Sequence, residues 1–539
     1  MMISKFRLFY NQNGVNLLLI LTSAIFYIAI FLLAAFLNVW EDELYTLNTT
    51  SKNLQYALHQ STHFELQPPV YFLLLTIWRS ISASIFWARA FSILMVALSQ
   101  VLLYNFTKKL STPKIAAIFS IFFLINPLTI FTALEIRPYA LVLFLSMAIT
   151  VLFYNTYYSN RTSALSRVTF ILTAFAALFT QYYLGFLLFA NSIVLIFTKK
   201  GKSLFYYLLD MAIPLIAIIL YIPQIRLSLS LHADSITIPD RTTIENLTEV
   251  VKLLVQTSFG RLFSFNLSVQ SYWFWIFKGV IVVLFLVSIQ FSRMKDGLRK
   301  MYPFILIFTI LYFFFVCLFW MFGDTGVANK YTTVMFVPVF MTMILMFIYL
   351  IKPRFLAFWI VILTVVNLGA NFQTYHNLYK VNDYRSLSLY LAENEHKIEP
   401  IFVYRNIAAE NLELYYRGEN EIVPVPKAFS YNEGFGPDCW KITQQDIILI
   451  NEKMLRFPSF YVIIERSNLS GVRESEGVFM DFLKANFLLV EDKSFKEGIK
   501  LYEFTNRKSS DLFQNILLDN KNVTRLKSNQ EFITAIRTY

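Results

Sequence analysis

The sequence has 539 residues, of which 56% are hydrophobic, 17% are aromatic and only 15% are charged. A soluble protein of this size carries nearer a quarter charged residues, so the composition excludes an ordinary soluble globular protein. The formal net charge is +12. The basic residues sit in short loops between apolar runs, which is typical of membrane topology signals and not of a nucleic-acid-binding face.

The first long apolar run extends from Leu17 to Leu37. A membrane-spanning helix needs about 20 apolar residues, and in lipid such a run must be helical because every backbone amide has to be satisfied internally. The run is too long for the apolar core of a cleaved signal peptide and it ends in Asn38. We therefore interpret it as a retained first span.

Length and apolarity predict an α-helical polytopic membrane domain over residues 1–371, with about eleven transmembrane helices. The predicted spans are 16–37, 84–106, 115–132, 138–157, 168–180, 184–198, 203–223, 271–291, 302–320, 332–350 and 355–371. With a cytoplasmic N-terminus, every second loop should be rich in Lys and Arg. Those loops carry Lys108, Lys109, Lys114, Arg161, Arg167, Lys199, Lys200, Lys202, Arg293, Lys295, Arg299, Lys300, Lys352 and Arg354. The opposite loops, 38–83 and 224–270, are expected to be extracytoplasmic.

Residues 372–539 are predicted to form a small soluble α/β domain on the extracytoplasmic side. Strands are expected at 401–404, 421–425, 460–464, 487–490 and 500–504, and helices at 384–395, 408–416, 443–455 and 478–485. The segment after about residue 507 is polar and is expected to be loosely held. A shorter apolar piece, residues 69–80, is too short to span and fits a helix lying along the membrane interface.

Three consecutive carboxylates, Glu41, Asp42 and Glu43, follow the first span. Such groups repel one another, and burial beside lipid would raise their pKa values. A solvated acidic loop that helps to set topology is the simpler alternative. Asp and Glu contribute little to topology, however, so this position favours a functional role.

Two more polar motifs lie in predicted outer loops, one before the second predicted span and one between the third and fourth spans. His63 and Glu65 come just before two prolines, Pro68 and Pro69, which force an extended turn into the interfacial helix. A plain turn with two polar side chains would give the same pattern. The other motif, residues 135–139, contains Glu135, Arg137 and Tyr139. The charge of Arg137 is fixed and its shape suits phosphate, although a local surface pair with Glu135 is the alternative.

Lys330 lies in another predicted outer turn, where it could bind an anionic head group or merely extend toward the interface. Carboxylates and cations therefore gather at the outer ends of the predicted spans. A sugar linked to a lipid phosphate would need this mixture, with cations for the phosphate and a carboxylate for the acceptor.

At these residues the sequence resembles the GT-C superfamily of polytopic glycosyltransferases. The nearest branch includes the protein O-mannosyltransferases and the bacterial transferases that decorate lipid A with aminoarabinose or galacturonate. The matching motifs are Asp42-Glu43, Pro68-Pro69-Val70-Tyr71-Phe72, Glu135-Ile136-Arg137-Pro138-Tyr139, Lys330-Tyr331 and Asp383-Tyr384-Arg385. The chain departs from the pattern at Gln67, where many relatives have His, and at Lys330, where many have Arg.

The resemblance implies an inverting transfer of a hexosyl or pentosyl group from a polyprenyl-phosphate sugar. Asp42 is then the candidate general base, with Glu43 orienting it or sharing its work. Arg137 and Lys330, with Glu135 and Tyr139, are the candidate phosphate and donor site. His63, Glu65 and Gln67 are candidate supporting residues. Related enzymes leave the use of a divalent cation open, and no other cofactor is implied.

The acceptor could be a lipid, a glycan or a protein, and the enzyme would work within the lipids of the plasma membrane. The C-terminal region has no Gly-x-Gly-x-x-Gly or Walker sequence, so a nucleotide-sugar donor is disfavoured. The main alternatives are a transporter or flippase and a surface-glycan polymerase that handle lipid-linked sugars. Few charges lie inside the spans and no inverted repeat is evident, which disfavours a transporter.

Overall fold

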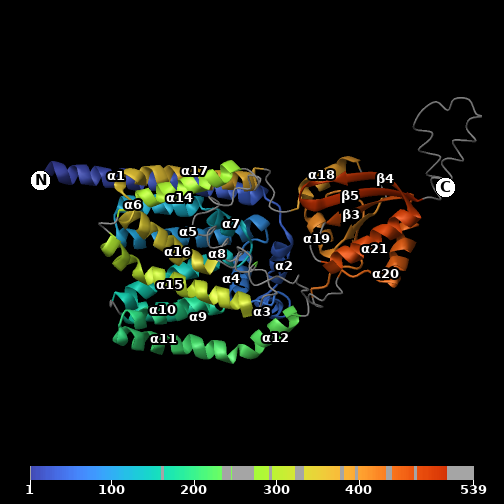
Figure 1. Cartoon of the computed structure of the whole chain (residues 1–539). Helices are drawn as coiled ribbons and strands as arrows, with labels where there is room; N and C mark the ends of the chain where they lie inside the picture. Colours follow the sequence, from blue (N-terminus) through green and yellow to red (C-terminus); the bar gives the residue numbers. More distant parts are fainter. Residues whose placement is uncertain are drawn as a thin grey trace, which may run out of the picture. The chain divides into compact units, whose positions relative to one another are not determined.

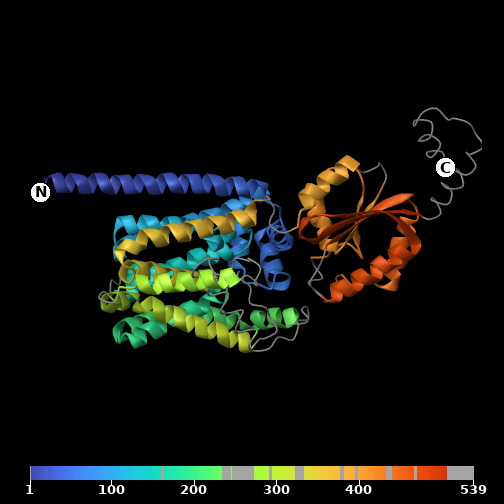
Figure 2. The same cartoon turned by 45° about the horizontal axis from the view of Figure 1, so that its top comes forward.

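The computed structural model describes residues 2–159, 163–233, 245, 272–290, 294–321, 333–376, 382–394, 399–431, 440–465 and 470–506. The chain divides into two compact units, Met1–Lys380 and Val381–Tyr539. The first unit is helical and the second is built around a β-sheet (Figures 1 and 2). The boundary expected at residue 371 falls inside the last helix of the first unit, α17 (Pro353–Tyr375).

The other helices of the first unit are mostly apolar. Their bounds are α1 (Met2–Phe36), α2 (Glu41–Thr49), α3 (Leu54–His63), α4 (Val70–Arg79), α5 (Ile85–Leu110), α6 (Pro113–Ile125), α7 (Pro127–Leu134), α8 (Tyr139–Phe153), the π-helical turn η1 (Tyr154–Tyr158), α9 (Ala164–Leu178), α10 (Leu184–Phe197), α11 (Gly201–Leu220), α12 (Ile222–Ala233), α14 (Tyr272–Ser288), α15 (Met294–Met321) and α16 (Thr333–Tyr349).

Six described helices are long and apolar enough to cross a membrane, and the bent pair α6 and α7 makes a seventh if it counts as one span. Four further predicted spans coincide with α9, α10, α14 and α16, which have 15, 14, 17 and 17 residues. These are shorter than the roughly 20 residues that a full crossing needs. The helix positions therefore agree with the predicted segments, while the number of eleven spans stays a prediction. The expected interfacial helix is α4, and the loop expected from residue 224 begins with α12.

The bend between α6 and α7 has a local cause in the sequence. Pro127 cannot donate a backbone hydrogen bond and keeps the preceding residue out of the helical region. Asn126 accordingly has an extended ψ of 131° and its side chain accepts a hydrogen bond from the backbone N–H of Leu128 at 2.9 Å. The two helices meet at 58°. The short helix α7 ends at Leu134, and Glu135 follows directly, close to the start of the buried helix α8.

The second unit contains a five-stranded sheet with the order β2-β1-β3-β5-β4. The strands are β1 (Ile401–Tyr404), β2 (Ile422–Val425), β3 (Ser459–Glu465), β4 (Phe487–Ser494) and β5 (Ile499–Asn506). Strand β1 pairs in parallel with β2 and β3, with Ile401 opposite Ile422 and Tyr461, whereas β5 pairs antiparallel with β3 and β4. The strands lie where the sequence predicts them.

Helices cover both faces of this sheet (Figure 1). Alternate residues of β1 point to opposite faces. Ile401 and Val403 pack against α18 (Tyr384–Asn394) and α19 (Asn406–Tyr415), while Phe402 and Tyr404 join a core with α20 (Gln444–Met454) and α21 (Ser470–Asn486). Helix α21 begins earlier than predicted because Val472 and Phe479 both face the core, although charged residues and glycine obscure the pattern between them. Residues after 506 lie outside the described part.

Candidate active site

The acidic motif after the first span forms the first turn of α2. Trp40 caps the helix through its backbone, whose carbonyl oxygen accepts hydrogen bonds from the N–H groups of Glu43 and Leu44 at 2.9 and 3.1 Å. Acidic side chains in a first turn interact favourably with the positive end of the helix dipole. The Trp40 indole N–H donates to Glu135 Oε2 at 2.7 Å. The motif is therefore tied to the turn before α8.

Glu43 is completely buried and paired with an arginine that the sequence analysis did not select. Arg89 Nη2 lies 3.0 Å from Glu43 Oε2, and the two side chains are 1% and 0% exposed. Glu43 Oε1 also accepts a hydrogen bond from the backbone N–H of Ile136 at 2.9 Å. Glu43 therefore links α2 to α5 and to the turn before α8.

Arg137 lies at the centre of a cluster of side chains that also contains Asp42, Glu43, Thr46 and Glu65, which we call the Arg137 cluster. Its Nη1 is 2.8 Å from Glu65 Oε2, 2.8 Å from Thr46 Oγ1 and 3.0 Å from the carbonyl oxygen of Asp42. Burial alone would lower the pKa of Arg137, but Glu65 and Asp42 outweigh it and raise the pKa above its usual value. Arg137 is thus a fixed cation in a largely buried position.

Glu65 is presented by a strained turn between α3 and α4. Its neighbour Leu66 has a φ of 53°, a left-handed conformation that is uncommon for residues other than glycine. The Glu65 carboxylate, 2% exposed, accepts from Thr46 Oγ1 at 3.2 Å and more distantly from Gln67 Nε2 at 3.4 Å. Burial raises the pKa of Glu65, although Arg137 acts against this. Glu65 therefore balances the charge of Arg137.

Asp42 is the carboxylate of the cluster that a substrate can reach. Its side chain is 21% exposed, against 2% for Glu65 and 0% for Glu43. Asp42 Oδ2 lies 3.9 Å from Arg137 Nε, which is an ion-pair contact but too long for a hydrogen bond. Asp42 is thus partly exposed and lies next to a buried cation.

Two buried donors in this region lack an acceptor among the described residues. Arg137 Nε is one, and the hydroxyl of Tyr71, a side chain that is 1% exposed, is the other. Burial raises the pKa of the Tyr71 hydroxyl well above its usual value, so the group stays protonated and able to donate. Buried polar groups normally have partners, so these donors leave capacity for a ligand that carries acceptor oxygens.

The other predicted site residues fall into three groups. Glu135 is buried and bound to Trp40, and Tyr139 is buried at the start of α8, where its ring stacks on Phe131 at 5.9 Å. His63 is exposed and its ring contacts His59 and not Arg137. Lys330 lies outside the described residues.

Arg89 and Thr46 complete the cluster, and the sequence reasoning missed both. Arg89 stands in the apolar run of α5, whose other basic residues are in its last turn. A charged residue inside a membrane span is a signal of function or pairing, so Arg89 could have been selected on that ground. Thr46 gave no such signal, because it lies one helical turn after Asp42 in an ordinary helical segment.

The described residues contain no group of three or more His, Cys, Asp or Glu side chains that could hold a metal ion. Within the cluster, the Arg137 guanidinium occupies the position between Asp42 and Glu65. The negative charges of Asp42 and Glu65 are therefore balanced by the positive charge of Arg137.

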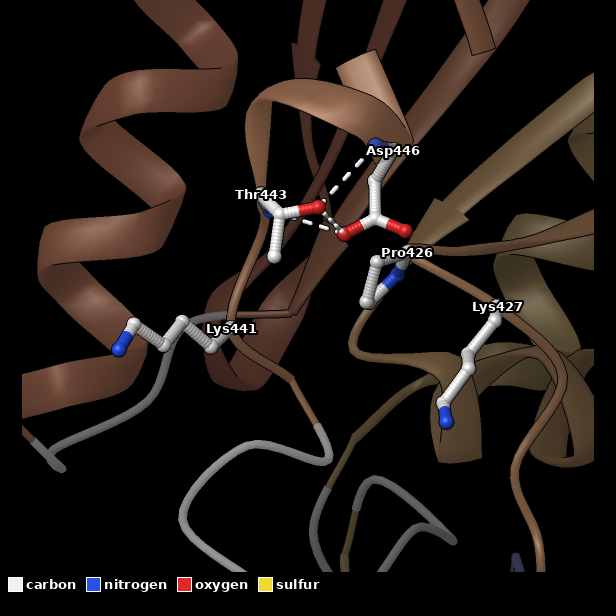
Figure 3. A pocket seen from close by; sticks show the side chains of 5 residues that line it. All are labelled: Pro426, Lys427, Lys441, Thr443 and Asp446. Carbon is white, nitrogen blue, oxygen red and sulfur yellow. Dashed lines mark hydrogen bonds between the residues drawn. The ribbon is translucent and has the colours of Figure 1, made fainter. Parts of the chain in front are cut away.

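The second unit contains a cavity of about 440 Å³ lined by Pro426, Lys427, Lys441, Thr443 and Asp446 (Figure 3). Asp446 Oδ2 accepts from the backbone N–H and the hydroxyl of Thr443 at 2.8 and 2.6 Å. These bonds form a capping box that starts α20. None of the predicted site residues lines this cavity, so the candidate active site is the cluster in the first unit.

No protein-family model and no curated protein sequence matches the chain. Among solved structures, the chain is similar to ArnT from Cupriavidus metallidurans in the apo state, with 9% identity, a TM-score of 0.43, and coverage of 91% of this chain and 98% of ArnT. The same ArnT bound to undecaprenyl phosphate gives 10% identity, a TM-score of 0.41 and coverage of 90% and 97%.

A third similar structure is the oligosaccharyltransferase of Archaeoglobus fulgidus, in a complex with zinc and sulfate. It is 13% identical, with a TM-score of 0.37, and the match covers 82% of this chain and 64% of the oligosaccharyltransferase.

Proposed function

We propose that this protein is a membrane glycosyltransferase that moves a sugar from a polyprenyl-phosphate donor to an acceptor hydroxyl. The observation that carries the proposal is the pairing of Asp42 and Arg137: a reachable carboxylate lies 3.9 Å from a buried, permanently charged guanidinium. A general base and an electrostatic partner for a leaving phosphate are the two groups that such a transfer needs.

In the proposed reaction the acceptor oxygen attacks the anomeric carbon of the sugar from the side opposite the phosphate. Asp42 accepts the proton of the acceptor hydroxyl as the new carbon–oxygen bond forms. The bond between the anomeric carbon and the phosphate oxygen breaks, and its electron pair leaves with the polyprenyl phosphate. This displacement inverts the configuration at the anomeric carbon.

Arg137 would stabilise the negative charge that grows on the departing phosphate oxygen. Its Nη1 is already bound to Glu65, Thr46 and the Asp42 carbonyl, so the guanidinium is held in place before substrate arrives. Its Nε and the Tyr71 hydroxyl, which have no hydrogen-bond acceptor among the described residues, are donors that phosphate or sugar oxygens could accept from. We assign Lys330 to the same phosphate, on sequence grounds alone.

Glu43 is assigned a positioning role. Its carboxylate binds Arg89 and the backbone of Ile136, so it has no exposed oxygen to offer a substrate. These bonds fix the first turn of α2 and so determine the position of Asp42, the residue before Glu43. Glu135 acts similarly through Trp40, and Glu65 acts by balancing Arg137.

The same cluster supports an orientation in the membrane. Arg89, near the start of α5, donates to the carbonyl oxygens of Leu37 and Asn38 at the end of α1, both at 2.8 Å. The other end of α5 carries Lys108 and Lys109. Since basic residues favour the cytoplasmic side, we propose that the Asp42 end lies outside the cytoplasm and the N-terminus inside.

Membranes that contain the protein, loaded with a labelled polyprenyl-phosphate sugar, test this proposal. We expect labelled sugar to appear on an acceptor while free polyprenyl phosphate accumulates in equal amount. A flippase would move the intact lipid-linked sugar across the membrane without breaking the sugar–phosphate bond. Intact transported donor without released polyprenyl phosphate would therefore overturn the transferase assignment.

A further inference from the structure

Helix α8 begins beside the Arg137 cluster and continues at its other end into the π-helical turn η1. The backbone N–H of Ser159 donates to the carbonyl oxygen of Tyr154, five residues earlier, at 2.8 Å. Such turns are rare and often occur at functional sites. Here the rings of Tyr154 and Tyr158 stack, with centroids 5.2 Å apart and planes inclined by 29°. The turn therefore presents a pair of half-buried tyrosine side chains.

Two lysines from separate segments contact this tyrosine pair. Lys109, in the last turn of α5, donates a hydrogen bond to the Asn155 side chain, and its Nζ lies 5.9 Å from the centre of the Tyr154 ring. Lys200, at the start of α11, has its Nζ 5.0 Å from the centre of the Tyr158 ring. Both distances are in the range of cation–π contacts.

Helix α15 brings a third lysine to the same place. The Phe304 ring stacks on that of Tyr154, with centroids 5.9 Å apart and planes inclined by 13°. Lys300 precedes Phe304 by four residues, so the two share one face of α15. Lys300 Nζ donates to the Tyr349 hydroxyl at 2.6 Å. The η1 cluster, as we call it, consists of Lys109, Lys200, Lys300, Tyr154 and Tyr158.

The carboxylates near the η1 cluster do not balance its positive charge. Asp210, the carboxylate that η1 contacts, is already paired with Arg167 at 2.6 Å. Asp296 lies one helical turn before Lys300 and is exposed. In the part of the chain that the structure describes, neither Lys200 nor Lys300 forms an ion pair with a carboxylate. The cluster therefore suits an anionic ligand.

The η1 cluster lies at one end of two candidate membrane spans. These spans, Ile85–Leu110 and Tyr139–Tyr158, both begin beside the Arg137 cluster and end at the η1 cluster. A helix rises by 1.5 Å per residue, so about 30 Å separates the two clusters. Phe197 at the end of α10 and Phe205 in α11 flank Lys200 in the sequence and are 61% and 66% exposed. Lysines therefore lie next to apolar side chains that face lipid.

We propose that the η1 cluster binds the phosphate headgroup of an anionic phospholipid, whose acyl chains lie against the exposed apolar side chains of α10 and α11. Basic pockets between membrane helices bind such headgroups. Lysines that only set topology need to lie in loops on one side of the membrane, but they need not meet at one pair of rings. On the orientation proposed above, the lipid belongs to the cytoplasmic leaflet. The binding itself depends neither on that orientation nor on sugar transfer.

Native mass spectrometry of the purified full-length protein in detergent, titrated with cardiolipin, tests the site. We expect one tightly bound cardiolipin per chain and much weaker binding of phosphatidylcholine, whose headgroup has no net charge. A lysine near an anionic lipid contributes about fivefold in affinity. Lys200→Gln and Lys300→Gln should therefore each weaken cardiolipin binding about fivefold, and the double variant about 25-fold. Lys114→Gln, which alters an exposed lysine at the start of α6, should bind like the wild type.

Two results would overturn the site: equal cardiolipin binding by the wild type and the Lys200→Gln/Lys300→Gln variant, or equal binding of cardiolipin and phosphatidylcholine by the wild type. Melting temperatures without added lipid check that the variants are folded. Both altered lysines are outside the proposed catalytic machinery, so sugar transfer is not needed as a readout.

Glycerol phosphate separates a lipid site from a site for soluble phosphate. It carries a phosphate group but no acyl chains, so it should not displace cardiolipin at equal concentration. Displacement at equal concentration would show that the η1 cluster recognises free phosphate and would overturn the lipid assignment.

Discussion

Arg89 and Glu43 form a doubly bonded ion pair in a fully buried position. Arg89 Nη2 lies 3.0 Å from Glu43 Oε2, and Arg89 Nε lies 3.4 Å from Oε1. The remaining Arg89 donors reach the carbonyl oxygens of Ala34, Leu37 and Asn38 at 2.8 Å. All five guanidinium N–H groups therefore have acceptors, which compensates for the removal of the charge from water.

Replacing Arg89 alone should destabilise the protein strongly. Arg89→Met leaves Glu43 as an uncompensated buried charge, a change that typically costs about 3–5 kcal/mol. The double variant Arg89→Met/Glu43→Leu removes both charges and should recover much of that loss. Thermal unfolding of the detergent-solubilised variants measures both effects. A single variant as stable as the wild type would show that this pair does not hold the region together.

Arg137→Lys should lower sugar transfer with little loss of stability. The charge that balances Glu65 is kept, but a lysine is a point charge without the guanidinium geometry. Loss of one preorganised donor typically reduces kcat by about 100- to 1,000-fold, and we expect an effect of that order. Arg354→Lys, at an exposed arginine, is the matched control. Equal transfer rates for the two variants would remove Arg137 from the mechanism.

Glu65 gives the stability of the protein a defined pH dependence. Burial raises its pKa above the ordinary value of 4.5, so the folded state holds the proton of this carboxyl more tightly than the unfolded state does. The stabilisation is complete below about pH 4.5 and is lost as the pH rises through the higher folded pKa. Relative to Glu65→Gln, the wild type should therefore lose melting temperature as the pH rises above about 4.5. Parallel melting curves over this range would contradict the shift.

A second ion pair provides a test of stability that is separate from activity. Asp210 accepts two hydrogen bonds from Arg167, at 2.6 and 2.8 Å, and one from the Tyr157 hydroxyl at 2.7 Å. Arg167 is 28% exposed, so solvent screens the pair and Asp210→Asn should cost about 1–3 kcal/mol. Transfer per folded molecule should not change. A selective loss of transfer would give Asp210 a role that the proposed mechanism lacks.

Periodicity predicts much of the fold from the sequence. Every predicted span coincides with a helix or a bent helix pair, and all five predicted strands are present. Periodicity does not fix the number of spans, because α9 and α10 have only 15 and 14 residues. Apolarity identifies such segments as buried but does not decide whether a short helix crosses the whole bilayer.

The candidate site could be predicted only in part. Motif order brought Asp42, Glu65 and Arg137 into one group, and the structure places them in contact. The division of roles was not predictable, because the spacing of Asp42 and Glu43 does not show which carboxylate is buried against Arg89. His63 was grouped with Glu65 by proximity in sequence, yet its position at the end of α3 turns it toward His59.

The most direct test of the account is sugar transfer by Asp42→Asn, measured from a labelled polyprenyl-phosphate sugar and normalised to folded protein. Loss of a general base typically costs about 100- to 10,000-fold, and we expect a decrease of that order with an unchanged melting temperature. Glu41→Gln, which alters the adjacent carboxylate bound by the Tyr45 hydroxyl, should retain near wild-type transfer. An Asp42→Asn protein that transfers sugar at the wild-type rate would contradict the central claim.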